Sequence, residues 1–273
     1  TEKRIGGEGM TIAELCDAFE IEAYELLDST QTRARERVLA GLRAPAAVLA
    51  DAQSAGRGRS GRTWQSPPGA AVYLTLVWPS ARPLAAQSGL PLVAGLAVRA
   101  CLARWQVHAQ LKWPNDIWVE DRKLGGILVE GLPHAAGSTL LIGIGLNLAL
   151  PPAAGAAIDQ PWVDLAQLLD PPPPRNPLIG SLLVDLHRYL LRFELTGLED
   201  FNEEWTAADA LAGRTVCWSG PSGTEAGQAI GIDDLGRLRV IQDGQVRVIG
   251  AGEVRIRTGG NGDGDAPAAG PRQ

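Results

Sequence analysis

The chain of 273 residues is long enough for one medium-sized domain with a small companion, and it can bury a core without disulfides or metal ions. Hydrophobic residues make up 45% and charged residues 21% of the sequence, which is typical of a soluble globular protein. The net charge of −6 argues against a protein that coats nucleic acid.

The cysteines and histidines are scattered along the chain, and no pair has the spacing of metal ligands, so no metal site is expected. An odd number of cysteines without a CxxC pair fits a reducing compartment. The first nine residues are polar and form no signal peptide, and the longest apolar stretch, residues 90–102, is too short to span a bilayer. We therefore expect a cytoplasmic protein with no membrane partner.

The first half of the chain alternates predicted strands with two predicted helices. One helix is expected to begin at a cap formed by Ser29 or Thr30 and to end near Gly41. Residues 90–105 carry apolar side chains at i, i+3 and i+4, which predicts an amphipathic helix. Strands are predicted over residues 24–27, 47–50, 72–78, 107–113, 117–119, 124–130 and 140–148.

Two stretches rich in glycine or proline separate these elements. Residues 53–69 are expected to form a long loop, and residues 153–177 a loop or lid rather than core. Helices follow at residues 178–194 and 201–211.

The pattern changes near Gly213, where short β segments begin. They are predicted over residues 215–218, 227–232, 238–241 and 246–249. Asp243 and Gly244 form a two-residue hairpin signal, and the whole region is predicted to be a small β-barrel. Residues 258–273 hold no large apolar side chain and are expected to be disordered.

Positive charge is concentrated in one part of the chain. Residues 52–115 contain no acidic side chain and carry +7, which leaves −13 for the remainder of a chain whose net charge is −6. This segregation fits a small anionic ligand held at one place. Chance, with the charges on solvated surface, is the alternative, and it does not easily account for the missing carboxylates.

Residues 56–64 (GRGRSGRTW) contain the glycine spacing of a dinucleotide-binding loop. The context does not fit, because prolines follow where a helix should begin and no acidic residue lies about twenty positions downstream. The segment is instead expected to present three guanidinium groups to carboxylate or phosphate oxygens, with Trp64 as a stacking face for adenine. An RNA-binding arginine–glycine stretch is the alternative, although this segment is short and bracketed by strands.

Two further segments are residues 112–118 (KWPNDIW) and residues 122–130 (RKLGGILVE). The first is predicted to turn at Pro114 and Asn115 between two strands. In the second, Lys123 stands beside two glycines at the start of a strand, where it can direct a compact positive charge at an oxyanion. For an isolated lysine, a surface position in a hairpin is the more frequent alternative.

In this order and spacing, the three segments resemble the biotin–protein ligases. Residues 27–30 (LDST) are similar to the short biotin-contacting segment of that family, and residues 143–147 (GIGLN) to one of its later strands. The resemblance covers about residues 22–256. Lipoate ligases and octanoyltransferases share the fold but lack this combination of motifs, and they are the nearest alternative enzymes.

The resemblance implies an α+β fold with two domains. A catalytic domain like that of class II aminoacyl-tRNA synthetases, a mixed sheet with flanking helices, would span residues 22–211, and a small SH3-like β-barrel residues 212–257. Residues 1–21 would be an N-terminal extension and residues 258–273 a disordered tail. Too few residues precede the catalytic domain for the winged-helix domain of some members, so no DNA partner and no repressor activity is expected. A biotin-sensing regulator is the alternative, and a sheet-edge homodimer is left open.

The resemblance also implies the reaction: ATP-dependent formation of biotinyl-5′-AMP, with Mg²⁺ accompanying ATP, and transfer of biotin to a lysine of a biotin carboxyl carrier protein. The residues that it assigns to biotin are Ser29, Thr30, Gln53, Gly56, Arg57, Arg59, Lys123, Gly126 and Gly143. Those that it assigns to ATP are Arg59, Arg62, Trp64, Lys112, Asn115, Lys123 and Asn147. Its catalytic candidates are Lys123, Arg59 and Asp116, the last to organise the lysine attack or Mg²⁺. Gln31 departs from the family, which usually has asparagine there.

Overall fold

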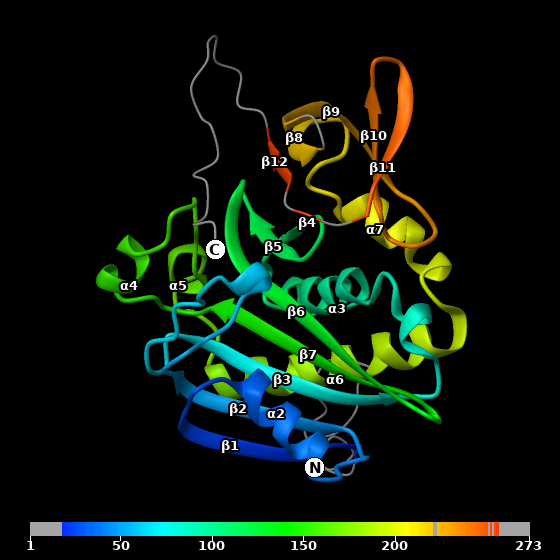
Figure 1. Cartoon of the computed structure of the whole chain (residues 1–273). Coiled ribbons are helices and arrows are strands. Elements are labelled where there is room, and N and C mark those ends of the chain that lie inside the picture. The colour runs from blue at the N-terminus through cyan, green and yellow to red at the C-terminus, as the bar shows by residue number, and fades with distance from the viewer. Residues whose placement is uncertain (1–17, 221–222, 251, 253, 257–273) are drawn as a thin grey trace, which may run out of the picture.

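A seven-stranded mixed sheet forms the larger part of the structure, a computed structural model that describes residues 18–220, 223–250, 252 and 254–256. Its strand order is β1-β2-β3-β7-β6-β5-β4, with β1 and β2 parallel and all other neighbours antiparallel (Figure 1). The strands are β1 (Glu20–Leu27), β2 (Ala46–Gln53), β3 (Ala71–Ser80), β4 (Gln110–Lys112), β5 (Asp116–Val119), β6 (Arg122–His134) and β7 (Gly137–Asn147).

The helices pack mainly around this sheet (Figure 1). The helices are α2 (Thr30–Leu39), α3 (Leu90–Arg104), α4 (Pro152–Ala156), α5 (Leu165–Leu168), α6 (Arg175–Thr196) and α7 (Asn202–Ala208). Short 3₁₀ turns are η1 (Arg59–Gly61), η2 (Leu84–Gln87) and η3 (Glu199–Phe201). None of the described helices combines the length and the apolar composition that crossing a bilayer requires.

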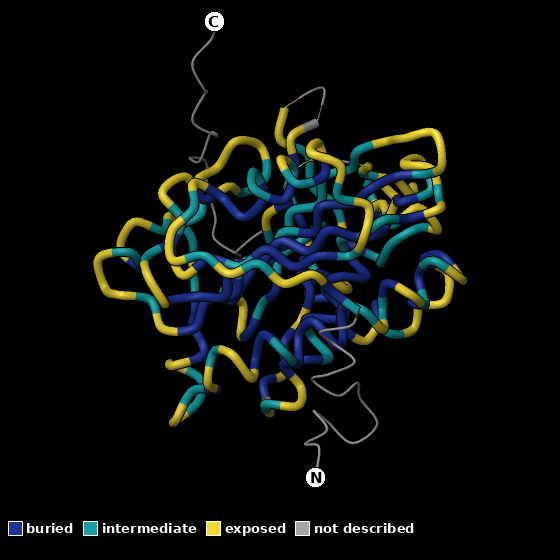
Figure 2. The backbone as a smooth tube through the Cα atoms, turned by 90° about the horizontal axis from the view of Figure 1, so that it is seen from below, coloured by how far each residue is buried: buried dark blue, intermediate teal, exposed yellow. Residues whose placement is uncertain are grey.

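The alternation of side chains along the strands gives the large sheet two different faces. On one face, Ile142 and Ile144 of β7 belong to the main core that the sheet forms with α3 and α6. On the other face, α2 covers only one end, where Val77 and Leu141 pack with the apolar side of that helix. The backbone is most deeply buried along the central strands (Figure 2). The rest of the second face is left without a covering helix.

A second sheet follows α7, with the order β11-β10-β9-β8-β12 and antiparallel pairing throughout. Its strands are β8 (Thr215–Gly220), β9 (Gly223–Ile232), β10 (Leu238–Gln242), β11 (Gln245–Ile249) and β12 (Val254–Ile256). Asp243 and Gly244 have φ angles of 50° and 75°, as the predicted two-residue hairpin requires. The indole N–H of Trp113 donates to the carbonyl of Gly236 at 2.9 Å, so the turn before β10 is fixed to the large sheet.

Several predicted elements are confirmed, and their local causes are visible. Helix α2 begins after Ser29, whose side chain accepts a hydrogen bond from the backbone N–H of Gln31 at 3.2 Å. Helix α3 confirms the predicted helix, but it is buried on nearly all sides and not on one face as the amphipathic pattern predicts. The turn between β5 and β6 is formed by Glu120 and Asp121, both with positive φ angles.

Other expectations are wrong and show where tertiary packing overrides local pattern. The strand expected over residues 107–113 is reduced to β4, because only that part finds a pairing partner in β5. The expected loop over residues 153–177 contains α4, α5 and the start of α6, and Val163 and Leu165 within it belong to the core. The strand expected over residues 24–27 is longer and begins at Glu20, and Phe19 before it is buried. The expectations for residues 1–17 and for the tail at 258–273 lie outside the described residues.

The contact between α6 and the sheet can be tested with two leucines on that helix. Leu186 is fully buried in the core, whereas Leu195 is 86% exposed. We expect Leu186→Ala to lower the free energy of unfolding by about 2–5 kcal/mol, because the substitution removes apolar contact and leaves a cavity. Leu195→Ala should change it by less than about 0.5 kcal/mol. Chemical denaturation of both variants measures the difference, and equal effects would contradict the packing described here.

Candidate functional site

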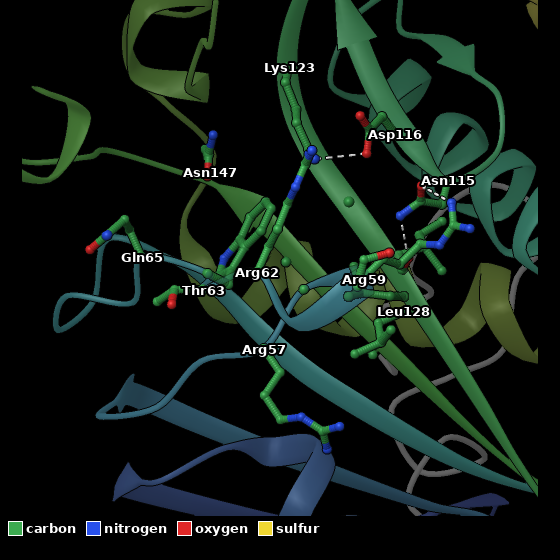
Figure 3. Close-up of a pocket in the computed structure, with 18 of the residues that line it drawn as sticks. Arg57, Arg59, Arg62, Thr63, Gln65, Asn115, Asp116, Lys123, Leu128 and Asn147 are labelled. Carbon is green, nitrogen blue, oxygen red and sulfur yellow. Dashed lines mark hydrogen bonds and ion pairs between the residues drawn. The ribbon is translucent and has the colours of Figure 1, made fainter. Parts of the chain in front are cut away.

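A cavity of about 410 Å³ lies on the part of the sheet face that α2 leaves uncovered (Figure 3). Residues from β3, β6 and β7 form its base, and the segment after β2 and the turn between β4 and β5 form its walls. The predicted site residues that line it are Ser29, Thr30, Gln53, Arg57, Arg59, Arg62, Trp64, Lys112, Asn115, Asp116, Lys123, Gly126, Gly143 and Asn147. The structure therefore brings together nearly the whole predicted set from segments that are far apart in sequence.

Gly56 is the predicted residue that does not line the cavity. Its carbonyl accepts a hydrogen bond from the Trp64 backbone N–H at 2.9 Å, which closes a hairpin over residues 56–64. A Cβ atom at this position would lie 2.4 Å from the Trp64 carbonyl oxygen and 2.5 Å from Ser66 Oγ. The structure thus gives Gly56 a part in closing the hairpin.

The floor of the cavity is polar and uncharged. The carboxamide oxygen of Gln53 accepts from the backbone N–H of Thr30 at 2.8 Å and from its hydroxyl at 3.2 Å. The hydroxyl of Thr75 lies 2.9 Å from the Thr30 hydroxyl and 3.1 Å from the carboxamide oxygen of Gln31. Because these groups can both donate and accept, the floor suits an uncharged ligand head that carries N–H and C=O groups.

The hairpin over residues 56–64 carries most of the cationic side chains. Its tip is turned by Ser60 and Gly61, whose φ angles are 54° and 74°. A guanidinium N–H of Arg59 donates to Oδ1 of Asn115 at 3.1 Å, and the Asn115 amide donates to the Ile127 carbonyl at 2.7 Å. These bonds connect the hairpin to the turn between β4 and β5 and to strand β6.

Trp64 lies against strands β6 and β7 where both carry glycine. A Cβ atom on Gly145 would lie 2.5 Å from the indole, and one on Gly126 would lie 3.4 Å from it. Only glycine therefore leaves room at position 145 for the indole in this place. The ammonium group of Lys123 lies 5.5 Å from the centre of the same ring, a cation–π arrangement.

Lys123 and Asp116 form an ion pair in the lining of the cavity (Figure 3). The Nζ atom lies 2.8 Å from Oδ1 of Asp116, and the two side chains are only 15% and 13% exposed. A partly buried pair of this kind holds the ammonium group in one place, because neither charge can return to water without losing its partner. Asn147 is held at the far side by a 3.1 Å hydrogen bond from its amide to the Val163 carbonyl.

The cavity is cationic overall. Among the residues that the structure describes, its lining includes Arg57, Arg59, Arg62, Lys112 and Lys123 but only two acidic residues, Asp116 and Asp159. The lining contains neither histidine nor cysteine, and among the described residues no group of His, Cys, Asp or Glu could hold a metal ion. The arrangement can bind and neutralise an anionic ligand, and it offers no nucleophile of the serine–histidine or cysteine–histidine type.

Sequence reasoning missed one wall of the cavity. Residues 157–160 and Trp162 come from the proline-rich stretch that was expected to be a loop or lid. The backbone N–H of Lys123 donates to the Pro161 carbonyl at 2.9 Å, and the N–H of Val163 donates to the Lys123 carbonyl at 3.0 Å. This pairing brings the stretch beside β6. A tryptophan between prolines and an apolar run was the available signal for a packed segment.

The chain was compared with known families and proteins. The model of the biotin/lipoate A/B protein ligase family matches residues 23–147. The bifunctional ligase/repressor BirA of Escherichia coli is 34% identical over 237 residues, covering 85% of this chain and 72% of that protein. The biotin–[acetyl-CoA-carboxylase] ligase of Paracoccus denitrificans is 31% identical over 223 residues, covering 77% of this chain and 90% of that protein.

Solved structures give the same result at the level of the fold. The biotin protein ligase from Aquifex aeolicus in complex with biotin and ATP superposes with a TM-score of 0.74 at 25% identity, covering 88% of this chain and 99% of that chain. The biotin protein ligase from Leishmania major in complex with biotinyl-5-AMP gives a TM-score of 0.55 with the same identity and coverage. The mixed α/β fold with a second antiparallel sheet is therefore shared with these proteins.

The contact between Trp64 and Gly145 can be tested by a double-mutant cycle. Gly145→Ala should lower the free energy of unfolding by about 1–3 kcal/mol, because the added methyl group overlaps the indole. In a Trp64→Ala background the same substitution should cost less than about 0.5 kcal/mol. Gly250→Ala is the control, since a Cβ atom there meets nothing closer than 3.5 Å. The free energies of unfolding are measured by chemical denaturation. An equal effect of Gly145→Ala in both backgrounds would contradict the contact between Trp64 and Gly145.

Proposed function

The chain belongs to the biotin/lipoate A/B protein ligase family, and within it to the biotin–protein ligases, and we propose that its cavity forms biotinyl-5′-AMP from biotin and ATP. We further propose that it transfers the biotin to a lysine of a biotin carboxyl carrier protein. The observation that carries the proposal is a single cavity with an uncharged polar floor and a cationic wall. Its volume of about 410 Å³ lies in the range of small-molecule sites.

The floor supports binding of the ureido head of biotin. That head offers two N–H donors and a carbonyl acceptor, and Ser29, Thr30 and Gln53 provide hydroxyl and amide partners of both kinds. Gly143 lies nearby, and a Cβ atom there would lie 2.7 Å from the Gln31 carboxamide. In this proposal the bicyclic ring lies on the bare backbone of β7, with its carboxylate chain directed toward Lys123.

The cationic wall supports the chemical step. The biotin carboxylate attacks the α-phosphorus of ATP, and the bond to the pyrophosphate leaving group breaks. Two anions must approach, so Arg59 and Lys123 would offset their repulsion and stabilise the charge that develops on the phosphoryl oxygens. The guanidinium group of Arg57 pairs with Glu130 outside the cavity, so Arg57 is proposed to act through the position of the hairpin. Correct placement of the two reactants can contribute about 7–11 kcal/mol more. No protein nucleophile is needed, which agrees with the lining described above.

The remaining predicted residues are proposed to hold the nucleotide. Trp64 offers an aromatic face, and Arg62, Lys112, Asn115 and Asn147 offer donors around the same cavity. Mg²⁺ would enter with ATP as part of the substrate. Since Mg²⁺ is usually held by one or two carboxylates together with phosphates, the exposed Asp159 fits this part better than Asp116, which is paired with Lys123.

In the second step, the ε-amine of the acceptor lysine attacks the acyl carbon of the mixed anhydride, and AMP leaves. Asp116 is the carboxylate beside Lys123 and is proposed to organise this attack. The residues of the hairpin would keep water from the anhydride until the acceptor arrives. In this proposal the protein acts in the cytoplasm on the carrier domain of a biotin-dependent carboxylase.

The proposal contains no DNA-binding function, although the names of four relatives include a repressor activity. A net charge of −6 opposes contact with a phosphate backbone, which supports a ligase without a DNA partner. The likeness of the large sheet to class II aminoacyl-tRNA synthetases, and of the second sheet to an SH3 barrel, also belongs to the proposal. So do the domain ranges 22–211 and 212–257, supported by the change from one sheet to the other after α7.

The complete reaction tests the proposed function. The purified chain is incubated with MgATP, biotin and a biotin-free carrier domain, and the carrier mass is measured. We expect one biotinyl group on one lysine, and no modification when lipoate replaces biotin. Modification with lipoate but not with biotin would indicate a lipoate ligase or octanoyltransferase of the same fold. No modification with either acid would refute the proposal.

The role of Lys123 gives a sharper test. Lys123→Ala should reduce the rate of adenylate formation by about 10²–10³-fold, because one preorganised donor to the developing charge is lost. Arg122→Ala is the matched control, since Arg122 is the next residue, does not line the cavity and pairs with Glu120 at 2.9 Å. The rate is measured as biotin-dependent pyrophosphate release. Adenylation at the wild-type rate by the Lys123→Ala variant would show that the assignment is wrong.

A further inference from the structure

Glu130 of strand β6 lies outside the cavity and joins two segments that form its walls. Oε1 lies 3.0 Å from a guanidinium nitrogen of Arg57, in the hairpin over residues 56–64. Oε2 lies 3.0 Å from a guanidinium nitrogen of Arg35, in helix α2. One carboxylate therefore connects the hairpin to the helix whose first turn supplies part of the cavity floor.

A third contact extends this connection to the floor itself. Together with Arg35 and Arg57, the side chain of Gln31 lowers the pKa of the Glu130 carboxyl. The Gln31 carboxamide also accepts from Thr75 at 3.1 Å and donates to the Leu141 carbonyl at 3.3 Å. Gln31 is buried, so its carboxamide belongs to the fixed floor of the cavity.

The surroundings of Glu130 keep it charged. Partial burial alone would raise its pKa, but the hydrogen bond from Arg35 and the charge of Arg57 hold that pKa below its ordinary value. The carboxylate is 19% exposed, less than either arginine, so it is the fixed centre of the cluster. At neutral pH the arrangement is one anion shared between two cations.

The hairpin is attached on two sides. On one side Arg59 is hydrogen-bonded to Asn115, in the turn between β4 and β5. On the other side Arg57 points away from Lys123 and Asp116, toward helix α2 (Figure 3). Trp64 holds the end of the hairpin against β6 and β7, and the ion pair with Glu130 adds a restraint on the part of the hairpin that carries Arg57.

We propose that Glu130 is a positioning residue that ties the hairpin over residues 56–64 to helix α2 and thereby retains the acyl-adenylate in the cavity. The inference rests on the proposed function. Glu130 touches no reacting atom in this account, because it does not line the cavity. Its loss should therefore affect how long the intermediate stays bound more than how fast it forms.

The experiment measures release of the intermediate from the full chain. The protein is loaded with labelled biotin and MgATP, free ligand is removed, and excess unlabelled biotinyl-5′-AMP is added. We expect Glu130→Ala to release the label about fivefold faster than the wild type, because the variant loses a partly exposed ion pair. Biotin-dependent ATP–pyrophosphate exchange at saturating substrates should stay within about twofold. Glu130→Gln keeps the shape of the side chain and some of its hydrogen bonds. Its release rate should therefore lie between those of the wild type and Glu130→Ala.

Arg35→Ala removes one partner of Glu130 without touching the cavity, and it is available if Glu130→Ala fails to fold. It should also speed release, and the double variant with Glu130→Ala should be no faster than Glu130→Ala alone. Arg33→Ala is the matched control, because Arg33 lies on the same helix with similar exposure but pairs with Glu22 and Glu36. It should release the label at the wild-type rate.

The outcomes separate this inference from the proposed function. Adenylate formation with unchanged release in both Glu130→Ala and Arg35→Ala would overturn the inference alone. Equal acceleration by Arg33→Ala and Arg35→Ala would also overturn it, because the effect would then belong to helix stability. A wild-type chain that forms no adenylate would overturn the proposed function, and this inference with it.

Discussion

The site depends on one face of the large sheet, where glycines at one end leave room for a cavity. Side chains alternate along a strand, so every second residue of β3, β6 and β7 points to the face that α2 covers only in part. At the covered end these positions hold Val77 and Leu141, which pack against the helix. At the open end β7 has Gly143 and Gly145, and β6 has Gly126. The cavity exists because these positions carry no side chain, and the indole of Trp64 occupies part of the room that results.

The second constraint is electrostatic. A carboxylate and a nucleotide repel each other because both are anions. The lining of the cavity contains cations from three separate segments, which are the hairpin, strand β4 and strand β6. The stretch without carboxylates along the sequence supplies most of them. Not all of its charge serves the cavity, however. Arg82 donates to the Phe193 carbonyl, Arg99 to the Ala109 carbonyl, and Arg104 pairs with the buried Asp185. Positive charge in this region thus serves helix packing as well as the lining of the cavity.

The residues that line the cavity could be predicted because their motifs resemble those of a known family and each motif lies on one local element. The capped start of α2, the arginine–glycine hairpin and the lysine before two glycines are all visible in the sequence, and they meet in one cavity. The Trp162 wall could not be predicted, because it depends on pairing between distant backbone groups at Lys123 and Pro161. The same holds for Glu130, whose role follows from three partners that sequence spacing does not bring together. The start of β1 depends on the burial of Phe19, and the length of β4 depends on how many of its residues pair with β5. Neither can be recognised from local sequence.

In the proposed function, one cavity activates a carboxylic acid with ATP and selects biotin by its polar floor. Isotope exchange between ATP and pyrophosphate is the decisive measurement, because it reports the adenylation step alone and needs no acceptor protein. We expect exchange that requires biotin, that lipoate does not support, and that Gln53→Ala weakens through a higher KM for biotin. Exchange with lipoate but not biotin, or no exchange with either acid, would contradict it.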